Sequence, residues 1–242
     1  MTDGAPGPLL VIGAHAADFV WRASGAVAMH TACGGRAVVV ALSYGERGES
    51  GDLWQQPGQT EEQVKQVRHR EASQAAEALG AELVPFDLGD YPLEPTAAAM
   101  DRLVELMRDV APETILTHTP LDPFNPDHPV ASAAADRARK LAMGAAGVPS
   151  AFRTIPAPRI YYFEPHHPEQ CGFLPNIFVD FTRVAERKEQ AMGAMASQTY
   201  LRDHYRQRSE QRAMQSRYFG AGREVRNVEA FQLATPRLVE RL

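Results

Sequence analysis

The sequence predicts an α/β protein built on a Rossmann-like, mostly parallel, doubly wound sheet with helices on both faces. Two observations predict it. Short, continuously apolar runs alternate with longer helical segments through the first 117 residues, and strands without polar alternation are typical of a parallel sheet that helices cover on both sides. The 242 residues are 44% hydrophobic and 23% charged, which is an ordinary globular composition and allows a full core.

The first four strands are expected where branched apolar residues run together, at residues 8–14, 36–42, 82–86 and 114–117. The segments between them repeat apolar residues every three or four positions, which indicates amphipathic helices. These helices are expected at 19–33, 61–79 and 96–110. Gly34 and Gly80 stand directly after two of them, where a glycine readily ends a helix.

Beyond residue 128 the pattern is mixed. We expect a helix at 129–143, strands at 160–163 and 177–181, and one or two helices within 183–218. No repeat or linker divides the chain. We therefore expect a single domain over 1–242, with a flexible tail at 1–7 and a helical C-terminal elaboration at 183–242.

Charge and composition narrow the class of partner and the compartment. The formal net charge of −5 argues against nucleic acid as the main partner, and no apolar run reaches the ~18–20 residues of a membrane span. The opening residues lack the basic region of a signal peptide. Cys33 and Cys171 form neither a CxxC pair nor a disulfide framework, so the cytoplasm is the expected compartment. The last sixty residues are rich in Arg and Met, and these side chains could form a contact between subunits of a homo-oligomer.

Ligands of such sheets lie at the carboxyl ends of the strands, and the loop after the first strand carries His15 and Asp18. This loop lacks the GxGxxG pattern of a dinucleotide-binding turn. Imidazole nitrogen and carboxylate oxygen are standard zinc donors, and both side chains can face one cation. From this loop alone, the alternative to a metal site is that His15 and Asp18 are ordinary polar side chains with hydrogen-bond partners in the protein.

The loop after the fourth strand reads DPFNPDH over residues 122–128. His128 can supply a third ligand, and two histidines with one carboxylate leave a position open for water, as catalytic zinc sites require. Asp127 is expected in the catalytic set as a group that orients an imidazole. Alternatively, residues 125–127 are only a turn that caps the next helix; the two interpretations are compatible.

Five segments, taken in order, resemble motifs of the PIG-L/LmbE-like family of zinc-dependent de-N-acetylases. They are AHAADF at 14–19, GERG at 45–48, RHRE at 68–71 with LG at 79–80, NPDH at 125–128 and SQ at 197–198. The resemblance covers roughly residues 8–200. It implies a Rossmann-like fold and one Zn²⁺ ion per chain, bound by His15, Asp18 and His128.

The chain departs from this family at the residues that transfer protons. The family's general base corresponds to Ala17, a following glutamate corresponds to Phe19, and the family's general-acid histidine corresponds to Asn125. A deacetylase must activate water and then protonate an amine leaving group. The departures therefore indicate that the metal site serves a different reaction.

One branch of the family, which hydrates 4-oxalomesaconate in bacterial gallate degradation, is similar in these departures. The similar segments are GAHAADFVWR (13–22), LSYGERGES (42–50), FDLGDYP (86–92) and FEPHHPEQC (163–171). The implied reaction is reversible addition of water to the C=C bond of this tricarboxylic oxo acid, giving 4-carboxy-4-hydroxy-2-oxoadipate. The alternatives are a zinc-dependent N-deacetylase of an amino sugar or related amide, and a non-catalytic protein that binds metal or a small acid.

Hydration requires a base near the attacked carbon and an acid near its neighbour. We expect Glu46 as the base, because it matches the family's glutamate, with Glu49 as the second candidate. His166 is the expected proton donor. Zinc would stabilise the negative charge of the enolate. Alternatively, Glu46 and Glu49 are solvated carboxylates of a loop, and His166 is a histidine of a surface loop.

A substrate with three negative charges also requires cations. Arg47 lies in the loop after the second strand and is expected to pair with a substrate carboxylate. Tyr91, His118 and Asn125 are expected to line the substrate pocket. Other arginines of this part of the chain are expected to be helix-surface charges: Arg22, Arg68 and Arg70.

Overall fold

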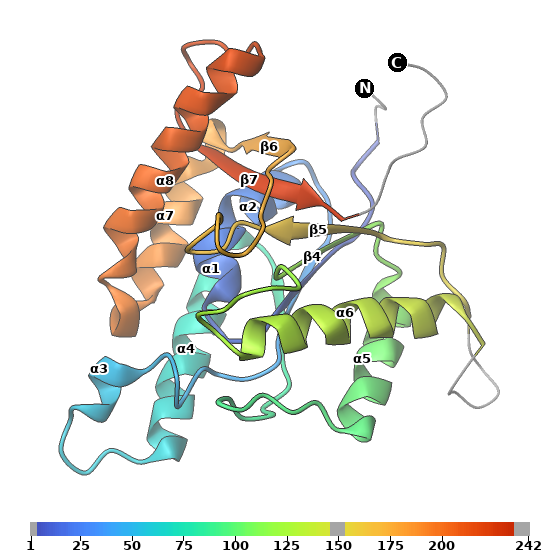
Figure 1. The fold of residues 1–242 in the computed structure, drawn as a ribbon, viewed down its shortest axis with the longest axis vertical. Coiled ribbons are helices and arrows are strands. Elements are labelled where there is room, and N and C mark those ends of the chain that lie inside the picture. Colours follow the sequence, from blue (N-terminus) through green and yellow to red (C-terminus); the bar gives the residue numbers. More distant parts are fainter. Residues whose placement is uncertain (1–3, 146–152, 235–242) are drawn as a thin grey trace.

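The computed structural model describes residues 4–145 and 153–234 and contains the sheet that the sequence predicts (Figure 1). Its strand order is β3-β2-β1-β4-β5-β7-β6. The strands are β1 (Leu9–Gly13), β2 (Ala37–Ala41), β3 (Glu82–Pro85), β4 (Thr114–Thr117), β5 (Arg159–Phe163), β6 (Ile177–Asp180) and β7 (Val228–Leu233). The first five pair in parallel, whereas β7 is antiparallel to both of its neighbours. The predicted fold class is confirmed.

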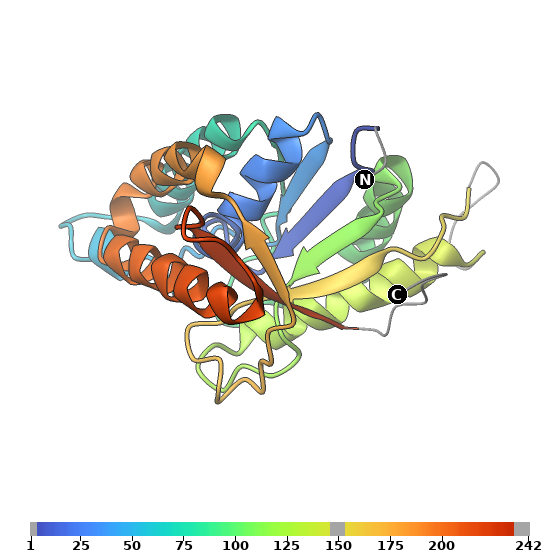
Figure 2. The same cartoon turned by 90° about the horizontal axis from the view of Figure 1, so that it is seen from above.

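Helices cover both faces of the sheet. They are α1 (Asp18–Arg22), α2 (Ser24–Ala32), α3 (Gly51–Trp54), α4 (Glu61–Leu79), α5 (Ala97–Val110), α6 (Asp127–Met143), α7 (Ala185–Ala194) and α8 (Leu201–Ser216), with 3₁₀ turns at Thr182–Val184, Ala196–Gln198 and Arg217–Phe219. In Figure 2 the sheet lies between α2 and α7 on one side and α6 on the other. Successive β1 residues alternate between the two cores: Leu9 and Val11 pack with α1, α2, α4 and α7, and Leu10 and Ile12 pack with α5 and α6.

The direction of chain winding reverses between β1 and β4. From β1 the chain moves outward through β2 to β3, then crosses back to pair β4 with the other side of β1. In doubly wound sheets such a reversal opens a crevice at the carboxyl ends of the strands, where ligands bind. The loops after β1, β2, β4 and β5 therefore end at the same edge, and in Figure 1 the arrow of β5 points toward α1 and α8.

Two helices show how far local sequence determines the boundaries. Helix α4 coincides with the predicted 61–79, because Thr60 and Gln63 form a capping box at its start and Gly80 takes a left-handed φ of 69° at its end. The helix predicted at 19–33 is two helices instead. They meet at Ala23, whose φ of −142° is not helical, and Ser24 Oγ donates to Val20 O across the break.

The strand β7 lies within the segment that the sequence predicts as a helical elaboration. Its second residue, Glu229, interrupts the apolar pattern, although the side chain is buried. The carboxylate accepts hydrogen bonds from Gly25 N and Ala26 N at the start of α2 and pairs with Lys188 Nζ at 2.5 Å. Residues 1–3 of the predicted tail and 235–242 of the elaboration lie outside the described residues. Among the described helices, none is both long and apolar enough to cross a membrane.

Candidate metal centre and active site

Side chains from three strand-end loops converge on one point at the edge between β1 and β4. His15, Asp18, Glu49 and His128 each offer one atom, and these atoms lie within 4.8 Å of one another. His15 Nδ1 lies 3.1 Å from Glu49 Oε1, and His128 Nε2 lies 3.6 Å from Asp18 Oδ1. The structure thus brings together the three predicted ligands and adds Glu49 to them.

The chemistry of this cluster fits a divalent cation. His15 Nδ1 and His128 Nε2 are buried and make no hydrogen bond, although buried polar atoms normally have partners. Both atoms face the carboxylates of Asp18 and Glu49. Two imidazole nitrogens and carboxylate oxygens at this spacing are the donor set of zinc-like ions.

Two further carboxylates orient the imidazoles from behind. Asp122 Oδ2 lies 2.7 Å from His128 Nδ1, and Asp127 Oδ2 lies 3.2 Å from His15 Nε2. Burial alone would raise the pKa of Asp122, but the hydrogen bond with His128 lowers it to about 2. Asp127 therefore has the orienting position that the sequence predicts. Asp122 was not predicted, and its only signal is its place six residues before His128.

His118 lies behind the cluster. Its ring stacks on His128 with centroids 3.9 Å apart, and Nε2 lies 3.0 Å from Asp18 Oδ2. Burial, together with the neighbouring His128, lowers the pKa of His118 to about 3, so the ring is neutral. This position differs from the predicted one, because His118 supports Asp18 and does not line the pocket.

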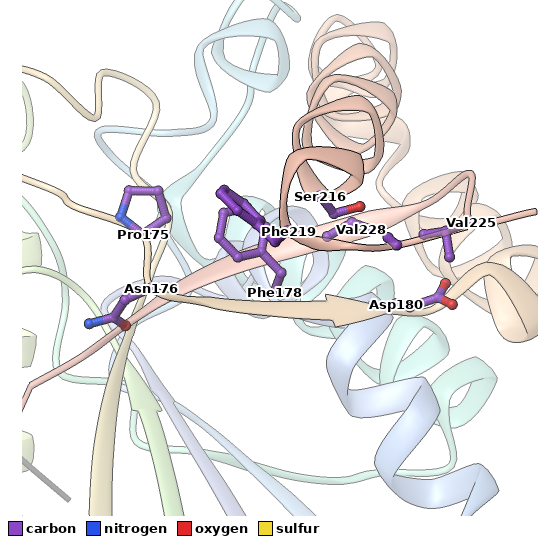
Figure 3. A pocket seen from close by; sticks show the side chains of 9 residues that line it. Pro175, Asn176, Phe178, Asp180, Ser216, Phe219, Val225 and Val228 are labelled. Carbon is purple, nitrogen blue, oxygen red and sulfur yellow. The ribbon is translucent and has the colours of Figure 1, made fainter. Parts of the chain in front are cut away.

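A cavity of about 480 Å³ adjoins the cluster. Its lining includes Asp18, Glu49, Tyr91, His166 and His204, which come from distant segments of the chain. His166 and Tyr91 thus lie where the sequence predicts. A second hollow of about 410 Å³ lies along β6 (Figure 3), where Asp180 is the single titratable side chain among mainly apolar neighbours. The first cavity alone combines proton-transfer groups with the cation cluster.

The structure separates the two glutamates proposed as bases. Glu46 is fully buried, with Oε1 at 3.5 Å from Lys65 Nζ and Oε2 accepting from Tyr44 N. Burial raises the pKa of Glu46, and its side chain does not line the cavity. Glu49 does line it. The geometry therefore favours Glu49 over the preferred Glu46.

Arg47 and Arg22 lie in the opposite of their expected positions, because Arg22 and not Arg47 lines the cavity. Arg47 points away from the cavity and pairs with Glu61 at 3.1 Å on the surface, so its predicted contact with substrate has no support. Arg22 is buried, lines the cavity and places Nε at 3.6 Å from Asp18 Oδ1. The prediction that Arg22 and Arg68 are surface charges was wrong: both are buried, whereas Arg70 is exposed. Arg22 is buried because α8 packs over α1.

The RHRE and SQ motifs meet in a buried network. Arg68 donates to Ser197 Oγ at 2.8 Å and to Gln198 Oε1 at 3.2 Å, and Glu71 accepts from Ser197 N at 2.8 Å. Gln198 also accepts from Trp21 Nε1 and lines the cavity. These residues fasten α4 to the turn before α8 and so fix one wall of the cavity.

Two of the three positions at which the chain departs from the family motifs, Ala17 and Asn125, have structural roles. Ala17 is buried in the hydrophobic core with no polar atom in its side chain. Asn125 Nδ2 donates to Glu49 Oε1 at 3.3 Å, and its Oδ1 accepts from Asp127 N. Asn125 thus supports Glu49 at the cavity, where the sequence predicts a substrate contact.

Comparison with known proteins identifies relatives of this chain. Residues 10–139 match the PIG-L family, described as GlcNAc-PI de-N-acetylase. A 4-oxalmesaconate hydratase from Pseudomonas putida KT2440 is 43% identical over 236 residues, which are 96% of this chain and 91% of that protein. The crystal structure of GalB, the 4-carboxy-2-hydroxymuconate hydratase from the same organism, superposes with a TM-score of 0.94 at 43% identity, covering 98% of this chain and 99% of that one.

A more distant structure shares the fold alone. The N,N'-diacetylchitobiose deacetylase from Pyrococcus horikoshii has a TM-score of 0.76 at 18% identity, covering 93% of this chain and 83% of that one. The family match spans more than half of this chain. The chain therefore belongs to the PIG-L family.

Proposed function

We propose that this protein is a metal-dependent hydratase that adds water to the C=C bond of 4-oxalomesaconate and gives 4-carboxy-4-hydroxy-2-oxoadipate. Relatives at 43% identity over nearly the whole chain are named as hydratases. One observation carries the choice of hydration over amide cleavage. The cation cluster is complete, while the position of the family's base is the buried methyl group of Ala17, which cannot activate water.

We infer that His15, Asp18 and His128 hold Zn²⁺. A bound zinc ion would supply electrostatic stabilisation for the negative charge that develops on the substrate's enolate oxygen. The buried imidazole nitrogens without hydrogen bonds support this assignment, as does the orientation of both rings by Asp122 and Asp127.

Glu49 is the proposed base that takes a proton from the attacking water. Its carboxylate lines the cavity, and Asn125 Nδ2 donates a hydrogen bond that restrains Oε1. Burial alone would raise the pKa of Glu49, but the facing imidazole of His15 lowers it to about 2, so the carboxylate is ionised. A general base must be charged and within reach of the water that it deprotonates.

His166 is the proposed acid that protonates the neighbouring carbon. Its Nδ1 lies 3.3 Å from Tyr205 Oη. Burial raises the pKa of Tyr205 far above its usual value, so the hydroxyl stays protonated and its oxygen can accept from Nδ1 of the imidazolium, which leaves Nε2 for the substrate. Burial, together with Arg22, lowers the pKa of His166 to about 3 in the free protein. Carboxylates that enter the cavity act in the opposite direction and favour the imidazolium.

The experiment that tests this function uses two substrates. Zinc-loaded protein is incubated with 4-oxalomesaconate, and the loss of absorbance of its conjugated enone tautomer is followed. Separately, acetate release from N-acetylglucosamine is measured. We expect enone loss without acetate. Acetate release alone would establish the de-N-acetylase instead, and no turnover of either compound would favour a binding protein.

A matched pair of substitutions separates the two glutamates. Glu49→Gln should retain zinc and lower kcat by about 10²- to 10⁴-fold, the usual contribution of a general base. Glu46→Gln makes the same change three residues away and should affect turnover far less, because Glu46 does not line the cavity. If Glu49→Gln loses zinc together with activity, Glu49 is a metal ligand. His15→Ala and His128→Ala should lose both together.

We also propose the cytoplasm as the compartment. Both cysteines are free thiols, with Cys33 exposed and Cys171 buried. Chains kept in a reducing compartment retain such thiols.

A further inference from the structure

One part of the wall of the catalytic cavity carries basic side chains that, apart from His166, the proposed mechanism does not use. Beside the cation cluster, the loop after β5 and the first turn of α8 contribute the imidazoles of His166, His167 and His204, and α1 contributes Arg22. The rings of His166 and His204 lie 5.5 Å apart. Among the described residues that line the cavity, the acids are Asp18 and Glu49, and both belong to the cation cluster.

The charges around this part of the wall leave an excess of positive charge. Glu164 precedes it in the chain, but both Arg208 and Arg212 pair with that carboxylate. Burial, and after it the positive charges of Arg208 and Arg22, lower the pKa of His204. The negative charge of an anion that enters the cavity would act against this shift.

Arg22 has an atom available for such an anion. The residue is 4% exposed. Nη1 donates to Glu164 O at 3.3 Å and Nε faces Asp18 Oδ1. Neither contact uses Nη2, which has no hydrogen-bond acceptor among the described residues. His204 likewise has ring contacts to His166 and Tyr205 and no hydrogen bond within the described chain. Guanidinium and imidazole N–H groups that converge on one cavity suit a carboxylate.

We propose that Arg22 and His204 form a carboxylate subsite, which holds the substrate carboxylate farthest from the oxo group and makes the enzyme prefer tricarboxylic to dicarboxylic oxo acids. This inference rests on the proposed function and deepens it. The cavity of about 480 Å³ is within the usual size range for small-molecule sites. The metal cluster would then engage the oxo-acid end, and the subsite would engage the other end.

The test compares two substrates that differ at the proposed contact. One is 4-oxalomesaconate in its conjugated tautomer, 4-carboxy-2-oxohex-3-enedioate, which carries a carboxymethyl group. The other is 2-methyl-4-oxopent-2-enedioate, in which a methyl group replaces that carboxymethyl group. For His204→Gln we expect kcat/KM on the tricarboxylate to fall about tenfold to a hundredfold, the range of a charge-assisted hydrogen bond, with little change on the dicarboxylate. Arg22→Met should lower discrimination further, and its zinc content is measured because Arg22 contacts Asp18.

Arg206→Gln is the matched control. Arg206 lies two residues further along α8 and pairs with Glu189 on the outer surface, so its loss removes a full charge from the same helix without touching the cavity. We expect it to leave both kcat/KM values unchanged. Equal losses on the two substrates in His204→Gln, or an effect of Arg206→Gln as large as that of His204→Gln, would overturn the subsite.

A binding measurement separates this inference from the proposed function. Calorimetric titration of the zinc-loaded protein with tricarballylate and with glutarate should show tighter binding of tricarballylate, and His204→Gln should remove most of the difference. Failure of the wild-type protein to consume 4-oxalomesaconate would refute the hydratase. Wild-type turnover combined with unchanged tricarballylate preference in both His204→Gln and Arg22→Met would refute the subsite alone.

Discussion

Removing the carboxylate of Asp122 is expected to weaken zinc binding although Asp122 is not a ligand. Its Oδ2 lies 2.7 Å from His128 Nδ1, and its Oδ1 accepts from Phe124 N at 3.0 Å, which fixes the side chain. The contact keeps the proton of a neutral His128 on Nδ1, so that the Nε2 lone pair faces Asp18. In Asp122→Ala the proton can move to Nε2, and in that tautomer Nε2 has no lone pair for the cation.

The expected loss of zinc affinity in Asp122→Ala depends on the contacts that still hold the His128 ring. Loss of a group that orients a ligand imidazole typically weakens metal affinity by about 10- to 100-fold, which corresponds to about 1.4–2.7 kcal/mol. The ring of His118 still stacks on His128 at 3.9 Å and limits ring rotation. We therefore expect the lower end of that range, about tenfold. Asp122→Asn keeps an acceptor oxygen and should lose less.

The assay is competition for Zn²⁺ between the metal-free protein and a chromophoric chelator at pH 7.5. Asp101→Ala is the control, because this aspartate is exposed on α5, far along the chain from the ligands. The reasoning would be refuted by an Asp122→Ala protein that is folded, as judged by circular dichroism, and binds zinc as tightly as the control.

Three further predictions concern stability, the cavity wall and pH. Glu71→Gln should lower the free energy of unfolding in urea by about 3 kcal/mol, because it leaves the guanidinium of the buried Arg68 without its ion pair; the double variant Arg68→Met/Glu71→Gln should recover part of the loss, and a further loss would contradict this. Gly48→Ala should lower kcat/KM by about tenfold or more without unfolding the protein, because the added Cβ would lie 2.1 Å from the Tyr91 ring; unchanged kinetics would show that the ring has room to move. Burial opposes protonation of His15, but the facing carboxylates raise its pKa well above the usual value. Zinc must displace that proton, so affinity should rise as pH rises, by up to about tenfold per unit below this pKa, and calorimetry in two buffers should detect about one released proton; an affinity that does not vary between pH 6 and 8 would contradict the assignment of His15 as a ligand.

Much of the fold follows from local patterns. The five parallel strands are short, mainly apolar segments, so their positions along the chain were predictable. Strand β7 was not, because its apolar pattern is interrupted by Glu229, and the partners that satisfy this carboxylate are Lys188 and the start of α2. Only long-range packing provides these partners.

The same distinction applies to the candidate site. The loop after β1 carries His15 and Asp18, and the loop after β4 leads to His128. The topology of a parallel sheet is enough to place these loops together. Arg22 and His204 could not be found in this way. Both are on helices, and their exposure depends on how α8 packs against α1, which no local pattern encodes.

The choice between Glu46 and Glu49 shows why a motif match can indicate the right loop and the wrong residue. The loop closes on itself, with Ser50 Oγ donating to Gly45 O at 2.7 Å and Asp90 accepting from Arg47 N and Gly48 N. This turn directs Glu46 toward Lys65 and Glu49 toward His15. On the proposed mechanism, the proton-transfer role belongs to the second glutamate. Exchanging the two activities within this family then requires changes at positions 17 and 125, next to Glu49, and leaves the proposed ligands His15, Asp18 and His128 untouched.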